Sequence, residues 1–398
     1  MKSNGHILWV DDEIHHLKPH ILYLETKGYK VSTATNGYDA EILNDNNKYD
    51  LILLDQTMPG IDGIDTLKKL KTRRITIPII MITKSEDEWL MDEAISHQVN
   101  QFLIKPVSPT QILIAVKQIL EKTKIIEDRT SSDYLNDFQK INDDLNNIES
   151  CDDWWKLYLR LVEWELKFDQ HGDTGLQSIL FEQIQSCNKE FSNFIEQSYA
   201  SLVKDEKSLL SPSVFKNHVL PQIKKNQKVC IIIVDCMRGD QFLSVIPYLE
   251  SLFNIEMTYH MSLIPSATPY SRNAIFSGLY PDELIKKYPN QKKLFVNNES
   301  SLNKYENIFL LDQLKGYKLS EKRVHYHKIW AIEEGNRFSK KINDYLKKDV
   351  LALVVNFVDM LAHDSSKMDV LKEIVPNEAG YRLAVKSWFE NSWFNDIL

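Results

Sequence analysis

The chain has 398 residues, of which 43% are hydrophobic and 26% charged, and its formal net charge is −8. This length predicts two or three domains, and the acidic balance argues against broad electrostatic capture of DNA or of an anionic membrane. No stretch reaches the roughly 18 to 20 apolar residues of a membrane span, and the four scattered cysteines indicate reduced thiols, so we expect a cytoplasmic protein without membrane insertion.

Short apolar runs alternate with amphipathic stretches in the first 121 residues. This alternation predicts strands with helices between them, which is typical of βαβ units and a parallel sheet. Five such pairs predict a doubly wound (βα)5 domain over residues 1–121, with ligands at the carboxyl ends of the strands. The five runs are 6–10, 29–34, 50–54, 78–82 and 101–104.

Acidic side chains occupy two of these strand ends. Asp11 and Asp12 follow the first run, and Asp55 follows the third. Acidic pairs after a strand are often solvated loop residues, but neighbouring parallel strands would bring these three carboxylates into one pocket. Their repulsion favours a hard cation such as Mg²⁺, which prefers oxygen ligands. Asp55 can then act as a nucleophile and form an acyl phosphate.

The fourth and fifth runs end in residues that suit a phosphoryl group. Thr83 can donate a hydroxyl hydrogen bond, and the ammonium group of Lys105 is a compact positive charge for the same oxygens. Pro106 permits a cis peptide that would aim Lys105 inward. We expect Phe102 to point toward the surface beside Thr83.

The strand ends together carry Val10-Asp11-Asp12-Glu13, Leu54-Asp55-Gln56-Thr57-Met58-Pro59-Gly60, Met81-Ile82-Thr83 and Lys105-Pro106. These motifs resemble the response-regulator receiver family. The resemblance implies phosphorylation of Asp55 by a sensor histidine kinase, and a Mg²⁺ ligand at the backbone carbonyl of Thr57. It also implies that Thr83 and Phe102 form the switch that responds to phosphorylation, and that the phosphorylated protein is a homodimer.

Residues 122–226 carry helical patterns instead of strand patterns. Two apolar stripes at spacings of three and four predict a helical bundle. We expect cap residues at Ser131-Ser132-Asp133 to open the bundle and Ser211-Pro212 to close it. Core packing explains the stripes better than a partner-binding surface does. The stripes are Tyr134, Phe138, Ile141 and Leu145, and Trp154, Leu157, Leu161 and Trp164.

A second α/β pattern occupies residues 227–398. Its buried runs, Val229–Val234 and Val350–Val355, lead to Asp235 and Asp359 respectively. His363 follows Asp359 by four residues, so both would face the same way on a helix, and a carboxylate with an imidazole suits Zn²⁺. An ordinary hydrogen bond within a turn or at the surface is the alternative for each aspartate.

Thr268 and Pro269 predict the N-cap and the first position of a helix. A hydroxyl group there lies at the positive end of a helix dipole, where phosphate is favoured. Taken alone, the pair is simply a capped helix.

Three segments of this region, residues 233–238, 266–279 and 358–363, resemble the PglZ family of the alkaline phosphatase superfamily. The resemblance implies a phosphodiesterase that acts on cyclic and linear oligonucleotides, with Thr268 as nucleophile. Two zinc ions would clamp the attacking and leaving oxygens. The implied roles are Asp235 and Thr268 as ligands of one zinc, Asp359 and His363 as ligands of the other, and Asn273 and Arg272 as contacts of phosphate oxygens.

The order of receiver, helical middle and PglZ domain resembles PorX-like response regulators, which regulate type IX secretion in Bacteroidetes. A secretion-system component or a sigma factor would then be a partner. The chain departs from the superfamily in one respect, because it contains no Asp-His dipeptide to complete the metal sites. We therefore expect a degenerate or C-terminally incomplete PglZ domain with weak zinc binding, unless His260, His325 or His327 supplies further ligands.

Three functions remain open on these grounds. The first is a phosphorylation-regulated zinc phosphodiesterase, and the second is a non-catalytic signalling adaptor that uses a degenerate PglZ domain to bind partners. The third, a DNA-binding transcription factor, is the least supported, since the chain is acidic and no helix-turn-helix pattern is evident.

Overall fold

The computed structural model describes residues 3–72, 77–84, 87–171, 174–205, 207, 209–289, 303–315, 323–365, 373 and 375–398. The chain divides into two compact units, Met1–Leu135 and Asn136–Leu398. None of the described helices has the length and apolar character needed to cross a membrane.

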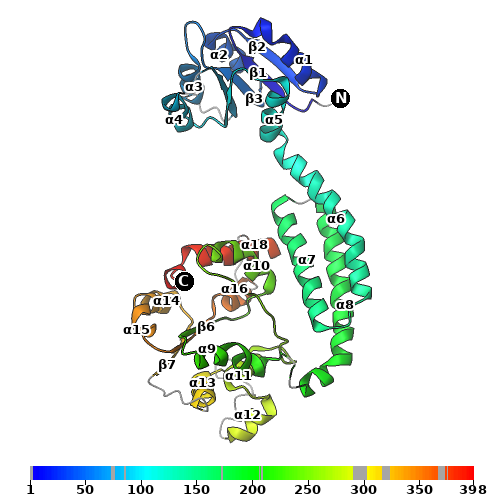
Figure 1. The fold of residues 1–398 in the computed structure, drawn as a ribbon, viewed down its shortest axis with the longest axis vertical. Helices are drawn as coiled ribbons and strands as arrows, with labels where there is room; N and C mark the ends of the chain where they lie inside the picture. Colours follow the sequence, from blue (N-terminus) through cyan, green and yellow to red (C-terminus); the bar gives the residue numbers. More distant parts are fainter. Residues whose placement is uncertain are drawn as a thin grey trace. The chain divides into compact units, whose positions relative to one another are not determined.

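The first unit is built on a parallel sheet in the order β2-β1-β3-β4-β5 (Figure 1). This is a doubly wound order, in which the carboxyl ends of β1 and β3 are neighbours. The predicted fold is confirmed, and each predicted run agrees with a strand to within one residue at either end. The strands are β1 (His6–Val10), β2 (Lys30–Ala34), β3 (Leu51–Asp55), β4 (Ile79–Thr83) and β5 (Gln101–Ile104).

Helices cover both faces of this sheet because its strands alternate buried side chains between two cores. Leu8 and Val10 of β1 pack in one core with α2, α3 and α4. Ile7 and Trp9 of the same strand pack in the other core with α1 and α5. The helices are α1 (Lys18–Thr26), α2 (Gly37–Asn46), α3 (Gly63–Thr72), α4 (Glu88–Ser96) and α5 (Pro109–Leu120).

Three long helices come next in the chain, α6 (Lys122–Asn146), α7 (Cys151–His171) and α8 (Thr174–Lys204). The helical bundle is confirmed, and the stripe of α7 that contains Trp154 and Trp164 is buried. The predicted cap at residues 131–133 is wrong, because α6 runs through it without a break. Serine and aspartate disfavour a helix interior only weakly, so neighbouring helix-forming residues carry the helix past them.

The C-terminal part of the second unit contains a parallel sheet in the order β6-β8-β7 (Figure 1). Its strands are β6 (Val229–Val234), β7 (Val324–Ile329) and β8 (Val350–Val355). The sequence predicted β6 and β8 but missed β7, whose alternating histidine, tyrosine and lysine side chains lack a continuous apolar run. Every residue of the central strand β8 is buried.

Short helices surround this sheet and enclose two apolar cores. One core joins β8 to α11 and α13, and the other joins it to α10, α14 and α18. The helices are α9 (Leu220–Lys224), α10 (Gly239–Leu249), α11 (Thr268–Ser277), α12 (Pro281–Lys287), α13 (Glu306–Lys315), α14 (Ile332–Ser339), α15 (Ile342–Tyr345), α16 (Phe357–Ser365) and α18 (Glu378–Asn391).

Candidate functional site

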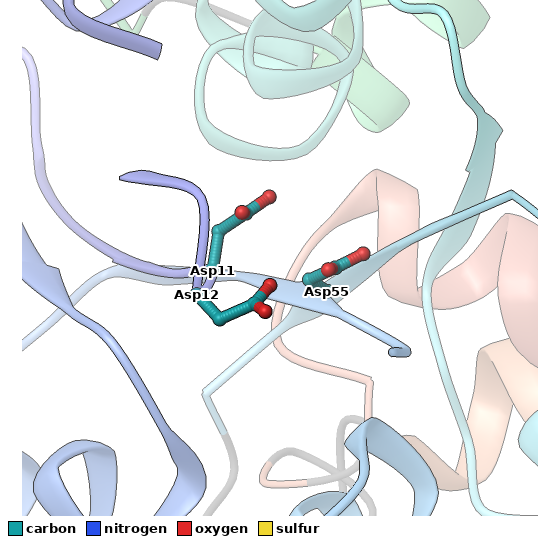
Figure 2. Close-up of side chains that lie close together, drawn as sticks. All are labelled: Asp11, Asp12 and Asp55. Carbon is teal, nitrogen blue, oxygen red and sulfur yellow. The ribbon is translucent and has the colours of Figure 1, made fainter. Parts of the chain in front are cut away.

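Three carboxylates meet at one edge of the first sheet. Asp11 and Asp12 lie directly after β1, and Asp55 ends β3, which pairs with β1 so that Val10 lies opposite Leu54. One oxygen from each carboxylate lies within 4.8 Å of the others, and Figure 2 shows the three side chains gathered at this edge. Asp11 and Asp55 are buried and Asp12 is half-buried, so most of this acidic cluster is shielded from solvent.

Lys105 bridges two of these carboxylates. Its Nζ lies 2.9 Å from Asp11 Oδ2 and 2.9 Å from Asp55 Oδ1. The backbone N–H of Lys105 also donates to the carbonyl of Thr83 at 2.7 Å, which ties the end of β5 to the end of β4. The peptide between Lys105 and Pro106 is cis. The sequence thus placed the ammonium group at the right strand end.

The pocket disfavours the negative charges that it contains. Burial raises the pKa of Asp55, and the neighbouring charges of Asp11 and Asp12 add to the rise, while Lys105 opposes it. Burial alone would lower the pKa of Lys105, but its hydrogen bonds to Asp11 and Asp55 outweigh this effect and raise it. A second cation would relieve the remaining repulsion. The all-oxygen donor set fits Mg²⁺, with Asp11, Asp12 and Asp55 as the residues that would hold it.

The two expected switch residues lie on neighbouring strands. Thr83 is fully buried at the end of β4. The strand register places Phe102 opposite Met81, two residues before Thr83 on the same face of the sheet. The Phe102 ring is partly buried against the core that includes Met81, so the expectation that it points toward the surface is corrected. Thr57, the expected carbonyl ligand, is exposed beside the pocket.

A second group of polar residues lies at the edge of the second sheet. Asp235 follows β6, and Asp359 lies near the start of α16, just after β8. The backbone N–H of Asp235 donates to the carbonyl of Val355 at 2.9 Å, so the two strand ends are side by side. His363 Nε2 lies 3.6 Å from Asp359 Oδ1, as their helical spacing predicted.

Thr268 starts α11 instead of capping it. The N-cap is Ala267, and no side chain caps the helix there. The predicted cap was therefore wrong by one residue, because Pro269 is tolerated at the second helical position as well as the first. Thr268 is half-buried in the first turn of the helix.

Arg272 has buried carboxylate partners in the structure. Its Nε donates to Glu306 Oε1 at 2.5 Å, and another of its N–H groups donates to Asp235. The hydroxyl of Tyr326 also donates to Glu306, at 2.6 Å. Arg272 is 3% exposed and Glu306 fully buried. The guanidinium that was expected to contact phosphate therefore holds Asp235 in place, and Asn273 donates from its amide to the carbonyl of Pro269 at 2.8 Å.

Two charged residues at this edge were missed by the sequence analysis, Glu306 and Lys328. Burial raises the pKa of Asp235, and Asp359 and Glu306 add to the rise against Arg272. Burial lowers the pKa of Lys328, and Arg272 lowers it further, while Asp235 and Asp359 oppose the shift. Lys328 is thus the half-buried cation that faces these carboxylates. No motif marked either residue, because each lies far along the chain from Asp235.

This second edge does not fit a closed zinc site within the described part of the chain. Among the residues described, the histidine, cysteine and carboxylate side chains form one group of three close ligands, which is the Asp11, Asp12 and Asp55 cluster. Asp235, Asp359 and His363 do not form another. The histidines proposed as substitutes lie elsewhere, since His325 and His327 stack on each other and on Tyr345.

Comparison with protein families gives a match for each region of the chain. A model of the response regulator receiver domain matches residues 7–117. A model of the PorX response regulator linker domain matches residues 124–203. A model of the BREX system PglZ alkaline phosphatase-like domain matches residues 214–386.

Similar individual proteins are bacterial regulators. The chain is 31% identical over 163 residues to the alkaline phosphatase synthesis transcriptional regulatory protein PhoP of Bacillus subtilis, covering 41% of this chain and 67% of that protein. It is 35% identical over 116 residues to the transcriptional regulatory protein ResD of the same species, covering 29% and 48%. The chain thus spans about half to two thirds of these relatives. The receiver domain of the Francisella response regulator 1452 is 28% identical, with a TM-score of 0.29, over 30% of this chain and 98% of that one.

Proposed function

Because this chain belongs to the response-regulator family, with the receiver, linker and PglZ domains of a PorX-like response regulator, we propose that it accepts a phosphoryl group on Asp55 from a sensor histidine kinase. The observation that carries the proposal is the buried cluster of Asp11, Asp12 and Asp55 with Lys105 across it.

The chemistry follows from the pocket. Bound Mg²⁺ would neutralise the carboxylates and draw the phosphoryl oxygens toward Asp55. A carboxylate oxygen of Asp55 attacks phosphorus, and the bond from phosphorus to its donor breaks, so the donor leaves with the bonding pair. Lys105 and the Thr83 hydroxyl then hold the phosphoryl oxygens by charge and by a hydrogen bond.

The first prediction tests the acceptor directly. Acetyl phosphate with Mg²⁺ should label the chain with an acid-labile phosphoryl group, and Asp55→Asn should abolish the label because an amide cannot form the acyl phosphate. Asp62→Asn, which changes a carboxylate on the exposed turn before α3, is the matched control. Equal labelling of the Asp55→Asn variant would disprove the assignment.

For the output, we propose that the PglZ domain provides the response. Asp235, Thr268, Asp359 and His363 are the residues that the family assigns to zinc phosphodiester hydrolysis of oligonucleotides. The pairing of Asp235 with Arg272 and of Asp359 with His363 favours weak metal retention. This supports the alternative of a phosphorylation-dependent adaptor. Whether the PglZ domain acts as an enzyme or as an adaptor, the PorX-like order of domains suggests that the protein regulates type IX secretion.

The second prediction separates these outputs. After dialysis, the 398-residue chain should retain less than one zinc per molecule and turn over little bis-p-nitrophenyl phosphate, because each metal would have only two of these ligands. Elemental analysis measures the zinc that is retained, and a colorimetric assay measures the turnover of bis-p-nitrophenyl phosphate. Stoichiometric zinc together with turnover that Thr268→Ala removes would contradict the prediction and favour the enzyme.

A further inference from the structure

A cavity of about 340 Å³ lies inside the second unit, away from both groups of residues described above. Helices α7 and α8, which pack on each other and run side by side in Figure 1, form one side. Residues 259–261, in the segment between α10 and α11, form the other. The volume is in the range of small-molecule sites. No function so far assigned to the chain uses this cavity.

Aromatic side chains make up half of the described residues that line it. The Trp155 ring stacks on Tyr259 with centroids 5.3 Å apart and an interplanar angle of 29°, and on Tyr158 at 5.8 Å and 22°. The Trp154 ring meets Phe191 edge-on at 5.2 Å. Flat surfaces of this kind bind a planar ring by stacking. The wall therefore selects a planar aromatic ligand over a flexible aliphatic one.

One polar side chain of the wall, His260, has no hydrogen-bond partner among the described residues. Burial, with the charge of His218, lowers its pKa, which favours the neutral ring with one donor and one acceptor nitrogen. The indole Nε1 of Trp154 also lacks a partner there, but it is sealed from solvent and does not open onto the cavity. A ligand that both accepts and donates hydrogen bonds would pair with the His260 ring.

The charge of the wall restricts the ligand further. No lysine or arginine is among the described residues that line the cavity. The Tyr259 hydroxyl of the wall donates a hydrogen bond to Asp152. A phosphate or carboxylate would find no counter-charge here. An anionic ligand is therefore disfavoured.

We propose that this cavity binds a planar heteroaromatic ring that carries no negative charge. Such a ligand would contact the helical bundle and the 259–261 segment at once. That segment continues directly to Thr268 at the start of α11. Occupancy of the cavity would therefore bias how the bundle packs on this segment.

Adenine is a suitable probe, and saturation-transfer difference NMR on the full chain is the measurement. We expect saturable binding that weakens about tenfold in Trp155→Ala, because stacking on an aromatic ring is worth roughly 1–3 kcal/mol per base. Tyr259→Leu, which removes the opposite wall, should weaken it similarly. Trp89→Ala changes an exposed tryptophan of the first unit and should leave adenine binding unchanged.

Three results would overturn the proposal. One is the absence of saturable adenine binding to the folded chain. The second is equal binding by the chain and by both cavity variants, once circular dichroism shows that they are folded. The third is binding of toluene as tight as that of adenine, which would mean that the polar side chain of the wall selects nothing.

Discussion

At the scale of single residues, Lys105 balances the negative charge of the acidic pocket when no metal is bound. Its ammonium group lies 2.9 Å from both Asp11 and Asp55 and is the cation that the described structure places between them. Coulomb interactions at such distances are strong in a buried pocket. Lys105 therefore stabilises the metal-free fold and also competes with a divalent ion for the same carboxylates.

The third prediction follows from this competition. Lys105→Gln should raise the affinity for Mg²⁺ about tenfold, because one competing charge is gone, and it should lower stability when EDTA is present. Melting temperatures measured across a series of Mg²⁺ concentrations, and in EDTA, give both the Mg²⁺ affinity and the stability of the metal-free protein. Lys286→Gln is the control, since Lys286 is an exposed lysine of the second unit, 3.1 Å from Asp282. An identical response to Mg²⁺ in the variant and the parent would contradict the argument.

At the scale of elements, a cluster of charges joins α7 to α10 and α18 within the second unit. Arg382 of α18 donates to Asp169 of α7 at 2.7 Å and to Asp240 of α10 at 2.8 Å. Glu165 lies one helical turn before Asp169, 3.6 Å from Arg382. One arginine thus serves three carboxylates. The packing of the bundle against these helices depends on how many of them are ionised.

The fourth prediction concerns Glu165. Burial raises its pKa to about 6, with Asp240 and Asp169 adding to the rise while Arg382 and Arg238 oppose it. Since the folded pKa exceeds the unfolded value, ionisation disfavours the fold. The unfolding free energy should therefore fall by up to about 2 kcal/mol as pH rises from about 4.5 to about 7.

Glu165→Gln should remove this fall, as chemical denaturation at pH 5 and pH 7 can measure. Glu163→Gln, at an exposed position of the same helix that pairs with Lys167, should retain it. Asp240 responds at lower pH, since hydrogen bonds from Arg238 and Arg382 outweigh burial and lower its pKa. A pH dependence that persists in Glu165→Gln would assign the effect to another group.

At the scale of the whole molecule, the proposed phosphorylation of the receiver requires a surface that responds to it. Thr83 and Phe102 share one face of the first sheet, and Thr83 ends the strand beside the acidic pocket. A phosphoryl group on Asp55 that accepts a hydrogen bond from the Thr83 hydroxyl would change the position of Thr83 relative to Phe102. Such a change can bias a surface that has two conformations. Exposed apolar residues on α4, β5 and α5, including Trp89, Ile95, Ile104 and Ile114, offer that surface.

The fifth prediction is that phosphorylation converts the chain into a symmetric dimer. Light scattering with beryllofluoride and Mg²⁺ should show a doubled mass, and Asp55→Asn should stay at the mass of the untreated protein. Trp89→Lys should block the dimer without blocking phosphorylation, because it places a charge on the exposed apolar surface. An unchanged mass over a wide concentration range would refute the prediction.

The sequence alone determined the acidic pocket. Its residues come directly after buried strands, and the carboxyl ends of parallel strands must meet at one edge, so local patterns were enough to bring Asp11, Asp55 and Lys105 together. The same argument placed Asp235 beside Asp359. Both results depend on short apolar runs, which are visible without any knowledge of distant contacts.

Tertiary structure decided the rest. Strand β7 exists because β8 pairs with it, although its own residues lack a strand pattern. Arg272 holds Asp235 and Glu306 because residues far apart in the chain meet in one buried core, and burial turns a free charge into a paired one. The aromatic cavity likewise needs α7, α8 and the 259–261 segment together. These partners are set by packing between segments that lie far apart in the chain, and no local sequence pattern predicts such packing.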